Sequence, residues 1–192
     1  GRIHVGLTPG ELDPMLESGR SVLKVSRRDL AFVLSQGLDG GTTVAATMIC
    51  AQLAGIRIFA TGGIGGVHRG VADTMDISAD LDELARTPVA VICAGAKAIL
   101  DLPRTFEVLE TRGVPVIGYG TDDLPGFYTQ TTGLPAPMRL DSPDGVAALA
   151  ARHWSLGLSS GLLIANPPPV QTALDPAFVE DAIGRALDAA YH

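Results

Sequence analysis

Four short apolar segments, with predicted helices in the stretches between them, constrain the fold of this chain more than any other feature. They are residues 56–61, 89–94, 115–119 and 162–165. Their length and their many β-branched residues predict buried strands. Helices are predicted at residues 27–35, 42–54, 79–86, 143–156 and 175–191, with another that ends over residues 107–111. Alternating strands and helices need crossover connections, so we expect a three-layer α/β/α fold in which a mostly parallel sheet is sandwiched between helices, a mixed sheet remaining compatible.

The other segments are predicted from their turn and capping residues. Thr8, Pro9 and Glu11 match the start of a helix, with Thr8 as the N-cap. Residues 3–7 resemble a strand that is entered midway, and residues 22–25 suggest another brief strand. Residues 37–41 are expected to form a glycine-rich turn, and residues 121–138 a long loop. No linker or repeat divides the sequence, which predicts a single domain over residues 1–192.

Composition narrows the classes of partner. The net charge of −7 argues against nucleic acid held by bulk electrostatics, although a few local cations would suffice for a phosphorylated small molecule. No apolar run approaches the length of a membrane span. Cys50 and Cys93 both lie in apolar runs, where buried free thiols are expected more than a disulfide. The chain is therefore expected in the cytoplasm, without a membrane or nucleic-acid partner.

A glycine-rich run follows the first of the four apolar segments. Thr61 leads into Gly62 and Gly63, and two more glycines come before residue 67. Such a run lets backbone N–H groups approach a ligand closely. It lacks the Lys-Ser/Thr ending of a P-loop and does not open directly into a helix, as the dinucleotide fingerprint does. We interpret it as a ligand-binding loop, with a mobile turn as the alternative.

Charged residues close to this run allow two interpretations each. His68 and Arg69 could hold an anion or anchor the loop to a neighbouring element. Asp76 precedes a predicted helix start and could bind a hard divalent cation with water. Ser78 and Asp80, in contrast, could serve only to cap that helix.

The sequence holds two lysines in positions of interest. Lys97 follows the most apolar strand among small residues, near an expected helix start, where a desolvated amine could attack a carbonyl and form a Schiff base. The alternative is an exposed lysine at a helix start. Lys24 lies beside another predicted helix start, where it could bind phosphate or belong to a solvated charged surface.

Together these segments resemble the pseudouridine-5′-phosphate glycosidase family, which includes indigoidine synthase A-like proteins. The resemblance runs over essentially the whole chain. Its most specific parts are the sequences KVSRRDL, GTTVAATM, FATGGIGGVHRG, DISADL and CAGAKAILDLP, which begin at residues 24, 41, 59, 76 and 93.

The resemblance implies reversible cleavage of the C–C glycosidic bond of pseudouridine 5′-phosphate to uracil and ribose 5-phosphate. It implies that Lys97 is the nucleophile and that Asp76 binds a divalent metal, manganese in this family. The residues implied to contact the substrate are Lys24, Val44, Ser78, Ala79 and Asp80. Thr61, Gly62, Gly63 and His68 are expected to line the pocket, and the family is trimeric.

Two departures from the family pattern concern the ends of the chain. Family members are longer at both ends, which leads us to expect a fragment of the family's domain. The family's acidic proton donor lies well upstream of the lysine matched by Lys24, so neither Glu11 nor Glu17 is assigned that role. A related sugar-phosphate enzyme of indigoidine-type pathways, or a sugar-phosphate-binding module with impaired catalysis, stays open as an alternative function.

Overall fold

The computed structural model describes residues 1–17 and 22–191, which contain two parallel sheets and the helices that cover them. The strands are β1 (Leu23–Val25), β2 (Gly40–Thr42), β3 (Ile58–Ala60), β4 (Ala90–Cys93), β5 (Val116–Tyr119), β6 (Met138–Leu140) and β7 (Leu162–Ala165). The helices are α1 (Pro9–Glu17), α2 (Arg27–Gln36), α3 (Val44–Leu53), α4 (Val71–Thr74), α5 (Ala79–Leu84), α6 (Leu102–Thr111), α7 (Pro143–Ser155) and α8 (Pro176–Tyr191).

The main sheet has the strand order β3-β4-β7-β5-β6, and every neighbouring pair is parallel. Strand β7 lies at its centre and is buried along its whole length. The predicted α/β class is therefore confirmed, and the sheets in the described residues are purely parallel. A sheet that is buried on both faces explains why its inner strands appear as continuous apolar runs without alternation.

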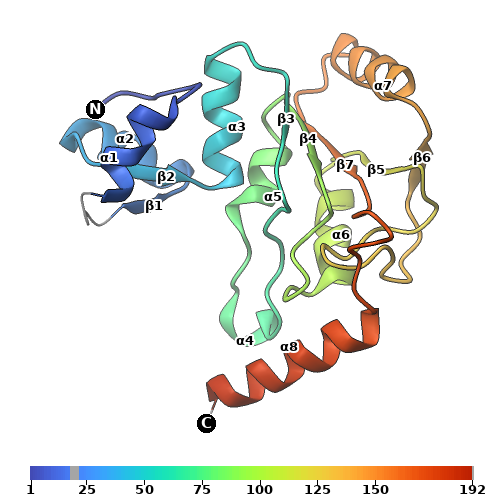
Figure 1. Cartoon of the computed structure of the whole chain (residues 1–192). Coiled ribbons are helices and arrows are strands. Elements are labelled where there is room, and N and C mark those ends of the chain that lie inside the picture. Colours follow the sequence, from blue (N-terminus) through green and yellow to red (C-terminus); the bar gives the residue numbers. More distant parts are fainter. Residues whose placement is uncertain (18–21, 192) are drawn as a thin grey trace.

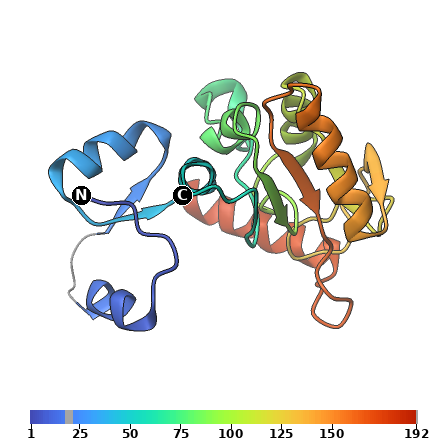
Figure 2. The same ribbon diagram turned by 90° about the horizontal axis from the view of Figure 1, so that it is seen from above.

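Helices cover both faces of the main sheet, as predicted. Leu81 and Leu84 of α5 and Leu109 of α6 pack on one face against Val91 and Leu163. The other face packs against α7, through side chains that include Ala150, Leu149 and Trp154. The view from above separates these layers (Figure 2). A sheet enclosed in this way presents its strand ends, not its faces, to a ligand.

Strands β1 and β2 form a small parallel sheet to one side of α3 (Figure 1). The turn predicted at residues 37–41 is thus wrong in its second half, which becomes β2. Gly37 ends α2 in the left-handed conformation (φ 62°), and the chain then returns beside β1 with Leu23 opposite Gly40. Three residues give too short a pattern for the sequence to predict a strand.

The strand predicted over residues 3–7 is also absent, because the segment runs without a ladder partner among the described residues. Its apolar side chains Ile3, Val5 and Leu7 are exposed. The helix that follows begins as expected, since the backbone N–H and the hydroxyl of Thr8 both donate to Glu11 Oε2 at 2.8 Å. These two bonds lower the pKa of Glu11, the backbone bond contributing most. None of the described helices could span a membrane.

Candidate functional site

The candidate site lies at the edge of the main sheet where the parallel strands end. In Figure 1 the strands β3, β4 and β7 run towards the side of the molecule where α4 and α8 lie. Thr61 directly follows β3, and Lys97 comes four residues after the end of β4. Both predicted residues are thereby placed at the edge where parallel sheets bind ligands.

The glycine run and the segment that carries Lys97 are hydrogen-bonded side by side. Ile64 N–H donates to the Gly95 carbonyl, and Lys97 N–H donates to the Ile64 carbonyl, each at 3.1 Å. The two segments form a parallel bridge between Ile64 and Ala96. Residues on either side of Lys97 are buried while Lys97 is exposed, so a fixed backbone carries a free side chain. The expected helix start at this lysine is wrong, because α6 begins only at Leu102.

Close packing, and not unusual backbone angles, explains the glycines of the run. None of the glycines at positions 62–66 has a positive φ. A Cβ on Gly63 would overlap the Phe127 ring, and one on Gly66 would overlap the Thr105 hydroxyl. Val67 N–H donates to that hydroxyl at 2.9 Å. The run is therefore a packed wall of the site and not a mobile turn.

Asp80 holds three parts of the site together. Its Oδ1 accepts the Ala45 N–H at the start of α3, and its Oδ2 accepts the Gly65 N–H, both at 2.8 Å. The side chain is 5% exposed. Ser78, the N-cap of α5, accepts the Asp80 N–H at 3.2 Å and donates its own backbone N–H to the Gly66 carbonyl at 2.9 Å. Ser78 and Asp80, two of the residues predicted to contact the substrate, thus sit in one hydrogen-bonded unit with the glycine run.

The other predicted members of that set surround this unit. Ala79 is exposed, whereas Val44 and Ser78 are half-buried. Val44 lies at the first position of α3, next to the amide that Asp80 accepts. Among the pocket residues, Gly62 is exposed, Thr61 is half-buried and Gly63 is buried.

His68 and Asp76 face each other across a short antiparallel bridge. The His68 N–H donates to the Asp76 carbonyl at 3.0 Å, and His68 Nδ1 lies 3.7 Å from Asp76 Oδ2. Both side chains are largely exposed. The described residues contain no group of three His, Cys, Asp or Glu side chains that could hold a metal. A carboxylate and an imidazole fit an open site of the kind in which water and ligand oxygens complete the shell.

Arg69 anchors the glycine-rich loop to a neighbouring helix, which favours the anchoring role over the binding of an anion. Its guanidinium forms a bidentate ion pair with Glu180 of α8, at 2.6 and 2.8 Å. The pair raises the pKa of Arg69 and lowers the pKa of Glu180, in both cases chiefly through the side-chain hydrogen bond.

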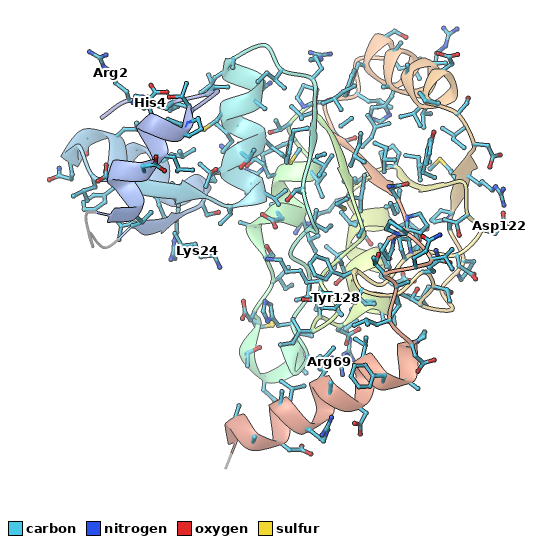
Figure 3. All side chains as sticks on the ribbon, viewed as in Figure 1. Arg2, His4, Lys24, Arg69, Asp122 and Tyr128 are labelled. Atoms are coloured by element: carbon cyan, nitrogen blue, oxygen red, sulfur yellow. The ribbon has the colours of Figure 1, made fainter. Side chains whose placement is uncertain are left out.

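Lys24 lies on the small sheet, away from the hydrogen-bonded unit around Asp80. It is exposed on β1, and Figure 3 shows it projecting from the side of the small sheet that faces the same end of the molecule as α4. Three residues later, Arg27 donates from Nε and Nη2 to the carboxylate of Glu83 on α5, at 2.5 and 2.7 Å. The hydrogen bond to Glu83 raises the pKa of Arg27. This ion pair joins the start of α2, directly after β1 and Lys24, to α5.

The sequence alone did not single out Arg27 and Glu83. Glu83 is 1% exposed and also accepts a hydrogen bond from the Thr87 hydroxyl. The available signal was its position: in a helix predicted over residues 79–86, Glu83 falls on the same face as Asp80. An acidic residue on a buried helix face needs a partner, and Arg27 supplies it.

The cysteine thiols are buried, and that of Cys93 hydrogen-bonds to the backbone of Gly95. Burial raises the pKa of Cys93 to about 11, against weaker lowering by backbone hydrogen bonds from Gly95 and Ile64. Burial also raises the pKa of Cys50. Both are free thiols, as predicted, and they stay protonated at neutral pH.

A cavity of about 1190 Å³ lies apart from the candidate site, between the N-terminal segment, α2 and the outer side of α3. Its lining is mainly apolar and contains none of the residues predicted for the site. A smaller cavity of about 340 Å³ adjoins the Arg69–Glu180 pair. The candidate site is assigned to the strand ends because polar side chains converge there, whereas the larger cavity is lined mainly by apolar residues.

Comparisons with known proteins show the family of the chain. The family model described as "Indigoidine synthase A like protein" matches residues 1–192. A pseudouridine-5′-phosphate glycosidase from Methylobacterium nodulans is 65% identical over 169 residues, which are 88% of this chain and 50% of the relative. One from Herpetosiphon aurantiacus is 57% identical over 187 residues, which are 97% of this chain and 61% of the relative. The chain thus spans about half to three fifths of the length of these relatives.

Two solved structures are similar over nearly the whole chain. The prealnumycin C-glycosynthase AlnA, solved in complex with ribulose 5-phosphate, superposes with a TM-score of 0.91 at 42% identity, over 96% of this chain and 60% of that one. An indigoidine synthase A-like protein from Thermotoga maritima gives 0.87 at 31% identity, over 93% of this chain and 59% of that one. By sequence and by fold, the chain belongs to the indigoidine synthase A-like family.

Proposed function

We propose that this chain carries the catalytic site of a pseudouridine-5′-phosphate glycosidase, which reversibly converts pseudouridine 5′-phosphate and water to uracil and ribose 5-phosphate. The observation that carries the proposal is the exposed amine of Lys97 on a fixed backbone at the carboxyl end of β4. The names of relatives with 57–65% identity support it. The sugar phosphate bound by AlnA supports the class of ligand.

Lys97 would act as the nucleophile. A C–C bond to a uracil carbon has no heteroatom whose protonation alone could make the base leave. In the proposed reaction the bond from C1 to the ring oxygen breaks, that oxygen takes a proton, and the amine bonds to C1 with loss of a proton. The bond from C1 to uracil then breaks as the imine forms, and a proton replaces C1 on the base carbon. Water then releases ribose 5-phosphate from the imine. The resemblance places the proton donor upstream of Lys24, and Glu11 is engaged with Thr8.

The substrate phosphate would be held by Lys24. This cation lies on the small sheet, and the first turn of the ten-residue helix α3 begins close by, after Thr43 N–H donates to the Val25 carbonyl at 2.9 Å. Val44 and the segment Ser78, Ala79 and Asp80 would contact the rest of the substrate. The packed glycine run would exclude water from one side of the reacting sugar.

Asp76 would bind a Mn²⁺ ion, with His68 as a neighbouring donor. When bound, such an ion supplies positive charge to oxygens of the substrate. Binding of Mn²⁺, followed by its electron paramagnetic resonance signal, tests this assignment independently of turnover. We expect Asp76→Asn to weaken binding at least tenfold, and unchanged binding would remove Asp76 from the metal site.

The nucleophile is tested by reductive trapping. Lys24 and Lys97 are the only lysines in the sequence, so peptide mapping after treatment with ribose 5-phosphate and borohydride can assign an adduct without ambiguity. We expect the adduct on Lys97, its loss in Lys97→Arg, and its retention in the matched variant Lys24→Arg. An adduct that persists in Lys97→Arg, or none in the unmodified protein, would refute the proposal.

A second candidate is a related enzyme that joins a sugar phosphate to a different ring, which the similarity to a C-glycosynthase favours. Both candidates would share the Lys97 adduct. A panel of acceptor rings, with ribose 5-phosphate as the donor, separates them, because strict dependence on uracil excludes the alternative.

We also propose a homotrimer in the cytoplasm. Exposed apolar side chains, among them Leu53 (71% exposed) and Ile58 (54%), offer surface for self-association. The free thiols of Cys50 and Cys93 fit a reducing compartment. Light scattering after size-exclusion chromatography tests the assembly, and a monomer at micromolar concentration would refute it.

A further inference from the structure

Tyr128 is an exposed aromatic side chain at the edge of the sheet that carries the candidate site. Phe32, Tyr128 and Phe178 are the most exposed aromatic residues in the described part of the chain, with exposed fractions of 59%, 52% and 58%. Phe32 belongs to α2 and Phe178 to α8. Figure 3 shows Tyr128 between the strand ends of the main sheet and α8. An open aromatic ring at this edge requires an explanation that the proposed residues do not give.

The preceding residue, Phe127, is held in an unfavourable backbone conformation. Its φ of 68° lies in the left-handed region, which is strained for a residue of this size. Its N–H donates to the Ala94 carbonyl at 2.9 Å, and its ring lies against Gly62 and Gly63. The Tyr128 ring meets the Phe127 ring edge to face, with 4.6 Å between the centroids and 81° between the planes. Phe127 thus fixes the direction of Tyr128 relative to the glycine run.

The loop around these rings is also fixed to the segment that carries Lys97. Gly95 adopts a φ of 96°, and a Cβ there would collide with the Pro125 carbonyl. On the other side, Leu174 N–H donates to the Tyr128 carbonyl at 2.8 Å. The loop that carries Tyr128 contains no helix or strand, but it is held on one side by the segment that precedes Lys97 and on the other by Leu174. Strain and fixed loops of this kind are concentrated at ligand sites.

We propose that the Tyr128 ring is a stacking surface for the planar uracil ring and determines specificity for the base. This inference rests on the proposed function. Cleavage at C1 requires the base to lie beside Lys97 while the phosphate extends away from it, and Tyr128 offers a π-face at that end of the site. Stacking of a base on an aromatic side chain is worth roughly 5- to 100-fold in affinity.

The test is the KM for uracil in the synthetic direction, with saturating ribose 5-phosphate. We expect Tyr128→Leu to raise this KM roughly 5- to 100-fold and Tyr128→Phe to change it less than threefold, because the second substitution keeps the ring. The control Phe32→Leu, which removes an equally exposed ring far from the strand ends, should leave it unchanged. The KM for ribose 5-phosphate and the trapped adduct on Lys97 should be unaffected in all three variants.

The outcomes distinguish this inference from the proposed function. If the unmodified protein forms no adduct with ribose 5-phosphate, the proposed function fails. If the adduct forms but Tyr128→Leu leaves the KM for uracil unchanged, or raises both KM values equally, only the stacking role fails. Should Tyr128→Leu not fold, the fluorescence of Tyr128→Trp gives a second readout. We expect uracil to quench the fluorescence of Tyr128→Trp and ribose 5-phosphate alone not to quench it. No quenching by uracil would contradict stacking.

Discussion

The ion pair between Arg27 and Glu83 is expected to respond very differently to removal of its two partners. The Glu83 side chain is 1% exposed, whereas that of Arg27 is 47% exposed. Arg27→Ala leaves a buried carboxylate with only the Thr87 hydroxyl as a donor. Removing one partner of a buried pair costs about 3–5 kcal/mol, and access of water to the vacated position places this case near about 3 kcal/mol.

Glu83→Gln should be much milder. The stranded group is then a guanidinium that already contacts water, and the glutamine oxygen can still accept the Thr87 hydroxyl. We expect a loss of about 1 kcal/mol, typical of a single hydrogen bond. The two single variants thus differ by about 2 kcal/mol, which is roughly a 30-fold difference in the folding equilibrium.

The double variant provides the sharpest test. Once Arg27 is absent, replacing the Glu83 carboxylate removes the stranded charge, so Arg27→Ala/Glu83→Gln should be more stable than Arg27→Ala alone. Urea unfolding followed by far-ultraviolet circular dichroism measures all of these free energies of unfolding. Arg185→Ala is the control, because its pair with Asp181 is exposed on both sides and should contribute less than about 0.5 kcal/mol. A double variant less stable than Arg27→Ala would refute the reasoning.

Further predictions concern packing, titration and thiol reactivity. Gly65→Ala should cost about 1–3 kcal/mol in unfolding free energy because its Cβ would overlap the hydroxyl that caps α5. Gly184→Ala, in open space on α8, should be neutral or stabilise by up to about 1 kcal/mol. The hydrogen bond from Arg69 lowers the pKa of Glu180 from 4.5, so the pair stabilises the fold above pH 4.5 and this stabilisation is lost as the pH falls through the lower pKa of the folded protein. Glu180→Gln should therefore make the free energy of unfolding depend less on pH in that acidic range. With a pKa of about 11, Cys93 should react with iodoacetamide at pH 7.5 only after unfolding, and rapid labelling of the native protein would contradict its burial.

The sequence predicts the inner strands of the main sheet well because each of them is a continuous apolar run, whereas the edge strand β6 was missed and begins at the last residue of the predicted long loop. Strand β7 is found at the predicted residues, β4 is one residue shorter than predicted at each end, and β5 is one residue shorter at its start. The small sheet was half missed, since Gly40 and Gly41 have no side chains that mark a strand. The segment at residues 3–7 was wrongly predicted as a strand because apolar composition does not reveal whether a neighbour is available for pairing.

The position of the candidate residues at the sheet edge was predictable from the sequence, but their connections were not. Strand ends in a parallel sheet point to Thr61 and Lys97 without knowledge of the fold's details. The bridging role of Asp80 depends on Ala45 and Gly65, residues far apart in sequence whose backbones meet only in the folded chain. A carboxylate that accepts two distant amides cannot be distinguished in a sequence from one that only caps its helix.

The strand order of the main sheet has a consequence for how the chain acquires its structure during synthesis. The central strand β7 pairs with β4 on one side and β5 on the other, yet it is made after both. Until residue 165 has left the ribosome, the nascent chain holds the β3–β4 and β5–β6 pairs as separate halves, each with an apolar edge that lacks its partner. Parallel pairing over such long sequence separations is slow, and unpaired edges promote aggregation. Chains that stall before β7 are therefore expected to be the form most dependent on chaperones.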